Sequence, residues 1–138
     1  MKIKLQQVID AIEEADDNWT GFYDSQTGET VWLGDRDFDD DYEETEELIE
    51  TSENRFYRLP TKYDIHEYSI IEDFVDDLPA GAIRNELMNA IRGRGAFRRF
   101  KDGINYHGIE QQWYDYQADA YKRIAIRWCR EEGLEYEE

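Results

Sequence analysis

A short basic segment offers the clearest chemistry in this sequence. Positions 92 to 101 read R-G-R-G-A-F-R-R-F-K, and the five cations of this segment are Arg92, Arg94, Arg98, Arg99 and Lys101. Its two glycines predict a turn between two helices, because glycine adopts the positive φ angles that such turns use. If the second helix begins near Gly95, cations fall in its first turn, where each opposes the helix dipole at a cost of ~0.3–1 kcal/mol. The segment therefore needs a negative counterpart.

Two sources of that negative charge are open. The first is internal: the acidic arm at residues 35–53, or Asp and Glu residues on neighbouring helices, pair with the arginines, and the surplus of acids favours this alternative. The second is an external anion, such as a phosphate, a nucleotide, a nucleic-acid backbone or an acidic peptide, because guanidinium groups and free N–H groups at a helix start bind anions. The segment is not a P-loop, since G-x-x-x-x-G-K-[ST] is missing. Both alternatives place Phe97 and Phe100 in the core.

An acidic run occupies residues 35–53 and contains one cation, Arg36. Its acids follow the spacing of an EF-hand calcium loop, in which alternate carboxylates and a glutamate at position 12 bind the ion. The candidate calcium ligands are Asp35, Asp37, Asp39, Asp41 and Glu46. However, Asp40 replaces the glycine required at the sixth position, and a predicted strand, not a helix, precedes the run. A solvated acidic loop is the competing interpretation.

Motifs of common enzyme classes are missing from the sequence, which contains no G-x-S-x-G, H-E-x-x-H or C-x-x-C. The two histidines, His66 and His107, have no metal-binding partner at a short spacing. Cys129 lies beside Trp128 in a helical pattern, so we expect a buried, inert thiol. The sequence therefore predicts no cofactor and favours binding over catalysis.

The charge is strongly asymmetric along the chain. The 138 residues include 34 Asp and Glu against 16 Lys and Arg, for a net charge of -18. Residues 1–83 sum to -18, residues 84–130 to +5 and residues 131–138 to -5. Such acidity disfavours nucleic acid and anionic membranes as partners and favours a basic protein. One cysteine, no signal peptide and no apolar run near the ~20 residues of a membrane span predict a cytoplasmic protein.

Three functional hypotheses follow from these charges. The leading one is a non-enzymatic binding or regulatory module that acts through protein contacts of its acidic surface. The alternative is a protein that binds an anion, phosphate or nucleotide through residues 92–101. The third is a mimic of nucleic acid that occupies a basic groove on a partner and inhibits it. The oligomeric state is not indicated.

The elements that must position these groups are predicted from hydrophobic periodicity and turn residues. Residues 3–15 predict a helix, residues 18–33 a β-hairpin, residues 43–51 a helix and residues 55–59 a short third strand. Four further helices are expected at 68–78, 83–91, 97–104 and 109–132. The fold class is α+β, with a small antiparallel sheet followed by a bundle of about four helices. Residues 1–138 are expected to form a single domain, with the acidic hairpin region in 1–60 and the helical region in 61–138.

Three strings in the second half carry a family resemblance. They are G-R-G-A-F-R-R-F-K-D at 93–102, W-Y at 113–114 and I-R-W-C at 126–129. With them the chain resembles the bacterial uncharacterised protein family numbered 0158, from about Val8 to Tyr136. The resemblance implies a bacterial cytoplasmic domain. It brings no catalytic residue, because that family is defined by sequence and not by a reaction.

Overall fold

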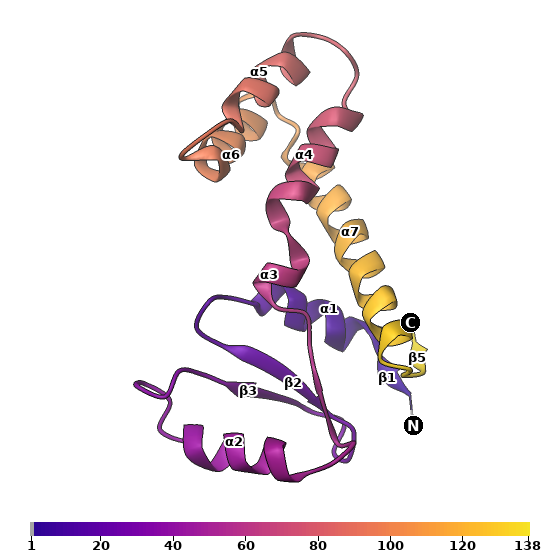
Figure 1. The fold of residues 1–138 in the computed structure, drawn as a ribbon. Helices are drawn as coiled ribbons and strands as arrows, with labels where there is room; N and C mark the ends of the chain where they lie inside the picture. Colours follow the sequence, from indigo (N-terminus) through magenta and orange to yellow (C-terminus); the bar gives the residue numbers. More distant parts are fainter. Residues whose placement is uncertain (1) are drawn as a thin grey trace. The chain divides into compact units, whose positions relative to one another are not determined.

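Two compact units make up the chain. The computed structural model describes residues 2–138, and these divide into a first unit, residues 2–65 and 121–138, and a second unit, His66–Ala120. The first unit holds β1 (Ile3–Lys4), α1 (Leu5–Glu14), β2 (Thr20–Asp24), β3 (Thr30–Leu33), α2 (Tyr42–Thr51), β4 (Phe56–Arg58), α3 (Lys62–Ile65) and β5 (Tyr136–Glu137). The second unit holds α4 (Glu67–Asp77), α5 (Ala82–Ala90) and α6 (Ala96–Tyr106). Helix α7 (Glu110–Glu131) contributes residues to both units (Figure 1).

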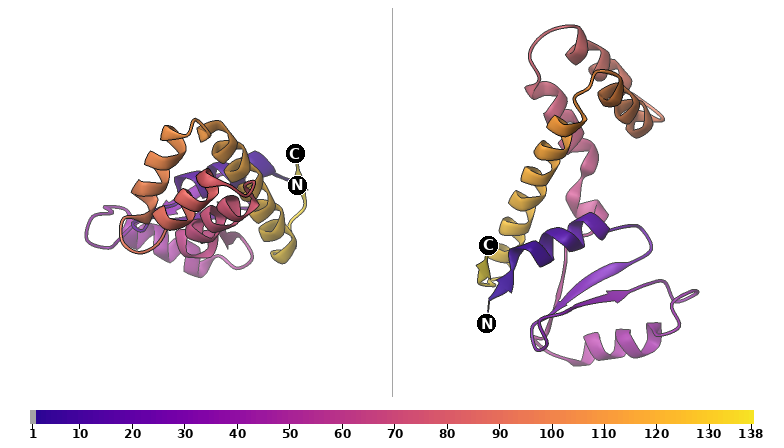
Figure 2. Two further views of the ribbon diagram at one scale, coloured as in Figure 1. Left: turned by 90° about the horizontal axis from the view of Figure 1, so that it is seen from above. Right: turned by 180° about the vertical axis from the view of Figure 1, so that it is seen from behind.

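The first unit contains two small sheets. An antiparallel sheet has the order β3–β2–β4, so that Phe22 in the central strand pairs with Val31 on one side and Arg58 on the other. Helix α2 runs alongside β3 (Figures 1 and 2). A separate parallel pair joins β1 to β5, with Ile3 opposite Tyr136. This pair brings the first and last strands of the chain together.

The core of the first unit is formed by α1, the antiparallel sheet and the C-terminal half of α7. Helix α1 buries four residues at helical spacing: Leu5, Val8, Ala11 and Ile12. Helix α7 contributes Tyr121, Ala125, Trp128 and Cys129, all of them buried. The indole Nε1–H of Trp128 donates a hydrogen bond to the carbonyl oxygen of Arg58 at 2.8 Å, which ties α7 to β4.

Three aromatic rings form the centre of the second unit. Phe74 of α4, Phe100 of α6 and Trp113 of α7 meet edge to face, with centroids 4.9–6.0 Å apart. Such pairs add ~0.5–1.5 kcal/mol each to the stability that their buried area provides. Close packing of α5 on α6 depends on Gly103, because a Cβ atom there would lie 2.6 Å from Leu87 Cδ2.

The α+β class and the three-stranded antiparallel sheet are confirmed. The predicted number of helices is wrong: five helices follow the sheet instead of about four, and residues 2–138 hold seven. The additional helix, α3, is a single turn, too short to show periodicity. Its local signal is a reciprocal cap, in which Thr61 Oγ1 accepts the N–H of Asp64 at 3.3 Å and Asp64 accepts the N–H of Thr61 at 3.0 Å. The strands β1 and β5 were not predicted, because each has only two residues and is too short to show an alternating pattern.

The single-domain prediction, with its division near residue 60, stays a prediction. Along the chain, the first unit ends at Ile65 and resumes at Tyr121, so residues 121–138 belong with the first unit. Across residues 2–138, every helix is too short or too polar to cross a lipid bilayer.

Candidate functional site

The basic segment forms the turn between α5 and α6. Helix α5 ends at Ala90 and α6 begins at Ala96, and Gly93 and Gly95 both have φ of 75°. Glycine favours this left-handed conformation, so the predicted turn is confirmed. Gly95 is the N-cap of α6, and no side chain caps the first N–H groups of that helix. Arg98 and Arg99 therefore lie in the first turn of α6.

Arg99 points back to the end of α5. Its Nε donates a hydrogen bond to the carbonyl oxygen of Ala90 at 2.8 Å, and its two terminal nitrogens donate to the carbonyl oxygens of Arg92 and Arg94. The last carbonyls of a helix have no partner within it and carry the negative end of its dipole. The negative counterpart of Arg99 is therefore the backbone itself, which is neither of the two sources that the sequence suggested.

The other four cations of the segment face solvent. They are Arg92, Arg94, Arg98 and Lys101. Among residues 66–120, no carboxylate oxygen lies within 4.0 Å of their charged nitrogens. Acidic side chains of the second unit therefore do not pair with these four cations. Whether they bind an anion stays a prediction.

Phe97 is not part of the core, and that prediction is wrong. The buried line of α6 follows Ala96, Phe100 and Ile104, which are spaced by four residues. Phe97 lies at the edge of this line, and it is 48% exposed. Its ring packs edge-on against Tyr68 with the centroids 6.3 Å apart. The prediction for Phe100, which is 1% exposed, is confirmed.

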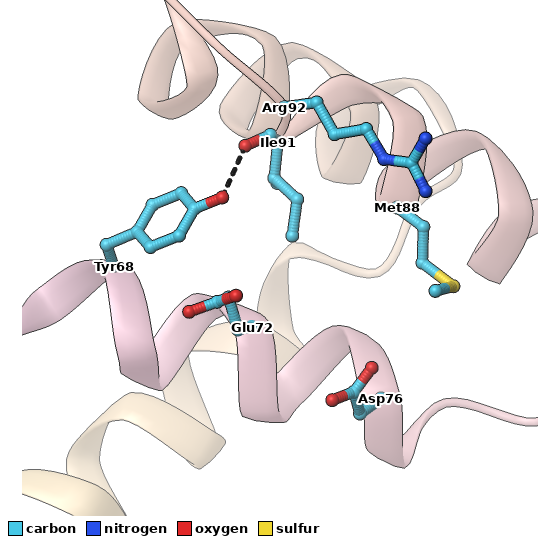
Figure 3. Close-up of a pocket in the computed structure, with 6 residues that line it drawn as sticks. All are labelled: Tyr68, Glu72, Asp76, Met88, Ile91 and Arg92. Atoms are coloured by element: carbon cyan, nitrogen blue, oxygen red, sulfur yellow. Dashed lines mark hydrogen bonds between the residues drawn. The ribbon is translucent and has the colours of Figure 1, made fainter.

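A groove lies between α4 and α5, beside the basic turn (Figure 3). It has a volume of about 200 Å³ and is lined by Tyr68, Glu72, Asp76, Met88, Ile91 and Arg92. The hydroxyl of Tyr68 donates to the carbonyl oxygen of Ile91 at 2.7 Å and closes one end. Sequence reasoning missed this groove, although the i, i+4 spacing of Tyr68, Glu72 and Asp76 already placed them on one face of a predicted helix.

The candidate calcium ligands lie in a turn and in the helix that follows. Asp35, Asp37, Asp39 and Asp41 precede or cap α2, and Glu46 lies within it. Asp39 accepts two backbone N–H groups, from Gly34 at 2.9 Å and from Asp41 at 3.1 Å. In the part of the chain that the structure describes, no three His, Cys, Asp or Glu side chains lie close enough to hold a metal ion. Calcium binding stays a prediction.

Two further reactive side chains, Cys129 and His107, lie at structural positions. Cys129 is buried as expected, and burial raises the pKa of its thiol. His107 at the end of α6 places Nε2 2.5 Å from Oε2 of Glu86 on α5. The contact between His107 and Glu86 joins α6 to α5.

A buried ion pair in the first unit was not visible in the sequence. Asp24 is 2% exposed, and its two oxygens accept hydrogen bonds from Nε and Nη2 of Arg55, each at 2.9 Å. The hydrogen bond to Arg55 is the main cause that lowers the pKa of Asp24 to about 2. The two residues are 31 positions apart, so no local motif announces the pair. It joins the end of β2 to the residue before β4, and its role is structural.

Comparison with known proteins places the chain in a family. The model of an uncharacterised protein family (UPF0158) matches residues 1–137. The chain belongs to the UPF0158 family. A relative, the UPF0158 protein PA5073 of Pseudomonas aeruginosa, is 23% identical over 93 residues. That match spans 67% of this UPF0158 chain and 61% of the relative. No solved structure matches the chain. The family name assigns no activity, so any function must be argued from the residues.

Proposed function

We propose that this UPF0158 chain is a non-enzymatic protein-binding module whose acidic face, residues 35–53, holds a basic segment of a partner. One observation carries the proposal: apolar side chains are exposed within a dense acidic surface. Phe38 is 48% exposed and stands between Asp37 and Asp39, and Leu48 is 42% exposed and follows Glu47. Apolar anchors surrounded by charge are typical of protein interfaces, in which anchors provide affinity and charges provide partner choice.

Helix α2 supports the proposal through an unfavourable charge distribution. Five of its ten residues are Glu, none of its residues is fully buried, and its last turn has no cation. Acidic residues near the C-terminus of a helix oppose its dipole by ~0.3–1 kcal/mol each. Glu50 lies in that position. A cationic segment laid against α2 would remove this penalty, so charge complementarity favours a basic partner.

The turn before α2 offers a hollow for a cationic side chain. This hollow, of about 310 Å³, is lined by one cation together with acids and aromatic rings: Arg36, Asp37, Phe38, Asp39, Asp40, Tyr42, Glu43 and Glu44. The guanidinium carbon of Arg36 already lies 5.5 Å from the centre of the Tyr42 ring. A cation near an aromatic face is attracted by ~0.5–1 kcal/mol at exposed sites. A lysine or arginine of the partner can make the same type of contact there.

The proposal is tested with two synthetic peptides of equal positive charge. One alternates Lys with Leu, and the other alternates Lys with Ser. We expect the Leu-containing peptide to bind the chain about tenfold more tightly, since one buried apolar anchor contributes more than 1 kcal/mol. The double variant Phe38→Ser/Leu48→Ser should abolish this difference and leave the Lys-Ser peptide unaffected. Equal affinities for the two peptides on the wild-type chain would reject a specific docking face.

A nucleic-acid mimic makes a different prediction in the same assay. Such a mimic binds through charge alone, so both peptides would bind equally and salt would weaken both equally. The exposed Phe38 and Leu48 favour the docking face over mimicry. A cross-linker at position 53, which is exposed and leaves both apolar anchors in place, then identifies the physiological partner in bacterial lysate, and its capture should require Phe38.

Anion binding at the α5–α6 turn is the second candidate function. It is favoured by Arg99, which holds the turn in place through three carbonyls while Arg94 and Arg98 remain exposed. Calorimetric titration with pyrophosphate and with a short single-stranded DNA tests it. The variant Arg94→Gln/Arg98→Gln should lose at least about tenfold in affinity, as expected for charge-assisted contacts. Arg99 must stay intact in this test, because its loss would disturb the turn. Absence of saturable heat with both anions would reject the site.

A further inference from the structure

The groove between α4 and α5 brings together two short side-chain stripes. On α4, Tyr68, Glu72 and Asp76 recur every four residues and therefore share one face. On α5 and the residues after it, Met88 and Arg92 are also four apart. Figure 3 shows the two carboxylates on one wall and the apolar side chains with the guanidinium on the other. The two walls thus differ in chemistry.

Three kinds of group meet in this small space. Glu72 and Asp76 supply negative charge, Arg92 supplies positive charge, and Met88 with Ile91 supplies an apolar wall. No carboxylate of the second unit lies within 4.0 Å of the Arg92 guanidinium, so the opposite charges do not neutralise each other by direct contact. The Tyr68 hydroxyl is already used by the Ile91 carbonyl, which fixes the closed end. The remaining charges are free to face a ligand.

We propose that this groove binds a small zwitterion, namely a free α-amino acid with an aliphatic side chain. Its ammonium group would lie against Glu72 and Asp76, and its carboxylate would lie against Arg92, as charge-assisted hydrogen bonds favour. Its side chain would cover Met88 and Ile91, where burial of each methylene contributes ~0.8 kcal/mol. The volume of about 200 Å³ is below the ~300–1,000 Å³ of pockets for drug-sized ligands, so a small ligand fits better.

The presence of both signs of charge selects the zwitterion over simpler ligands. A plain amine would satisfy the two carboxylates and leave Arg92 without a partner. A plain carboxylic acid would pair with Arg92 and face repulsion from Glu72 and Asp76. The competing occupant is the chain itself: Arg92 is exposed and can turn onto the carboxylates. In that case the groove is closed to every ligand.

The test is a titration of the full chain with leucine, followed through the methyl NMR signals of Met88 and Ile91. Two fragments serve as matched ligands: 3-methylbutylamine lacks the carboxylate, and 4-methylpentanoate lacks the ammonium. We expect saturable shifts with leucine, and affinities at least about tenfold lower for both fragments, because each loses one charge-assisted contact. No saturable shift up to ~10 mM leucine, or equal binding of the amine, would overturn the proposal.

Variants of the wall residues complete the test. Glu72→Gln, Asp76→Asn and Arg92→Gln each remove one charge of the groove, and we expect each to weaken leucine binding about tenfold or more. Asp73→Asn on α4 and Arg130→Gln on α7 are the controls, because both are exposed, neither lines the groove and neither belongs to the basic turn. The controls should change the affinity less than about twofold. Equal losses in controls and wall variants would show that leucine responds to overall charge and would reject the site.

Discussion

At the scale of single residues, Asp24 is a carboxyl group whose pKa is strongly lowered by its surroundings. It accepts hydrogen bonds from Arg55 and from the backbone N–H of Gln26 at 2.9 Å, inside a nearly closed environment. These contacts stabilise the charged form and lower its pKa from 3.8 to about 2. Since a group with a lowered folded pKa contributes stability above its unfolded pKa, this pair stabilises the fold above about pH 4.

Asp24→Asn should therefore change how stability depends on pH. Lowering the pKa of Asp24 from 3.8 to about 2 corresponds to about 2 kcal/mol of stability, which the wild type loses as the pH falls from about 4 through about 2. The variant should be less stable than the wild type at pH 7, and the difference should shrink steadily below pH 4. Urea unfolding followed by tryptophan fluorescence at several pH values measures this.

The control for that experiment is Asp73→Asn, which neutralises an exposed carboxylate on α4. It should stay within about 0.5 kcal/mol of the wild type at pH 7. A constant gap between wild type and Asp24→Asn from pH 7 to pH 2 would contradict the assigned role of the ion pair.

At the scale of elements, the turn between α5 and α6 is held by side chains that reach its carbonyls. Arg99 bonds those of Ala90, Arg92 and Arg94, and Tyr68 bonds that of Ile91. Four carbonyls at or beyond the end of α5 thereby gain donors without a further helical turn. The arrangement explains how five cations in ten residues can end a helix without acids beside them.

Arg99→Ala should destabilise the fold, and Arg98→Ala should not. Loss of a charged donor from three carbonyls costs roughly 1–2 kcal/mol at an exposed site. Arg98 makes no comparable contact, so its removal should change the free energy of unfolding by less than about 0.5 kcal/mol. Both variants lose one positive charge, which keeps the overall electrostatics equal. Urea unfolding compares them, and equal losses would show that Arg99 acts only through its charge.

The sequence predicted elements well where a pattern extends over several turns or strands. The helices α4 to α7 and the strands β2, β3 and β4 were found because apolar residues repeat at periods of 3.6 or 2. Single turns and two-residue strands such as α3 and β5 carry no period. The basic turn was predicted from Gly93 and Gly95. The hydrogen-bond partners of Arg99 were not predicted. They are backbone carbonyls, which every residue has, so the residue types do not indicate them. The groove was not predicted either, because it is formed by α4 and α5 together and the sequence does not show how two helices pack.

At the scale of the whole molecule, the distribution of charge between the units is the dominant feature. The first unit holds 24 of the 34 acidic residues and 10 of the 16 cations. In the second unit, five of the six cations fall within residues 92–101. Repulsion among the acids destabilises the folded state, and salt screens it over a Debye length of ~10 Å at 0.1 M. The protein should therefore gain stability as salt is added.

The acidic helix α2 should show this repulsion together with the effect of its dipole. Glu47→Gln/Glu50→Gln and Glu43→Gln/Glu44→Gln each remove two negative charges, from the C-terminal and N-terminal halves of the helix. Both double variants reduce the repulsion among the acidic side chains of α2. The first pair also removes charges that oppose the dipole and the second removes charges that favour it, by ~0.3–1 kcal/mol each.

We therefore expect Glu47→Gln/Glu50→Gln to be the more stable of the two variants in thermal unfolding at low salt. The difference should shrink toward zero near 1 M NaCl, where the Debye length falls to ~3 Å. Equal stabilities at low salt would contradict the dipole argument. The same variant should bind the Lys-Leu peptide more weakly than the wild type, because it removes acids from the docking face. Higher stability combined with weaker binding would show that the protein keeps these glutamates at a cost to its own fold, as functional residues often do.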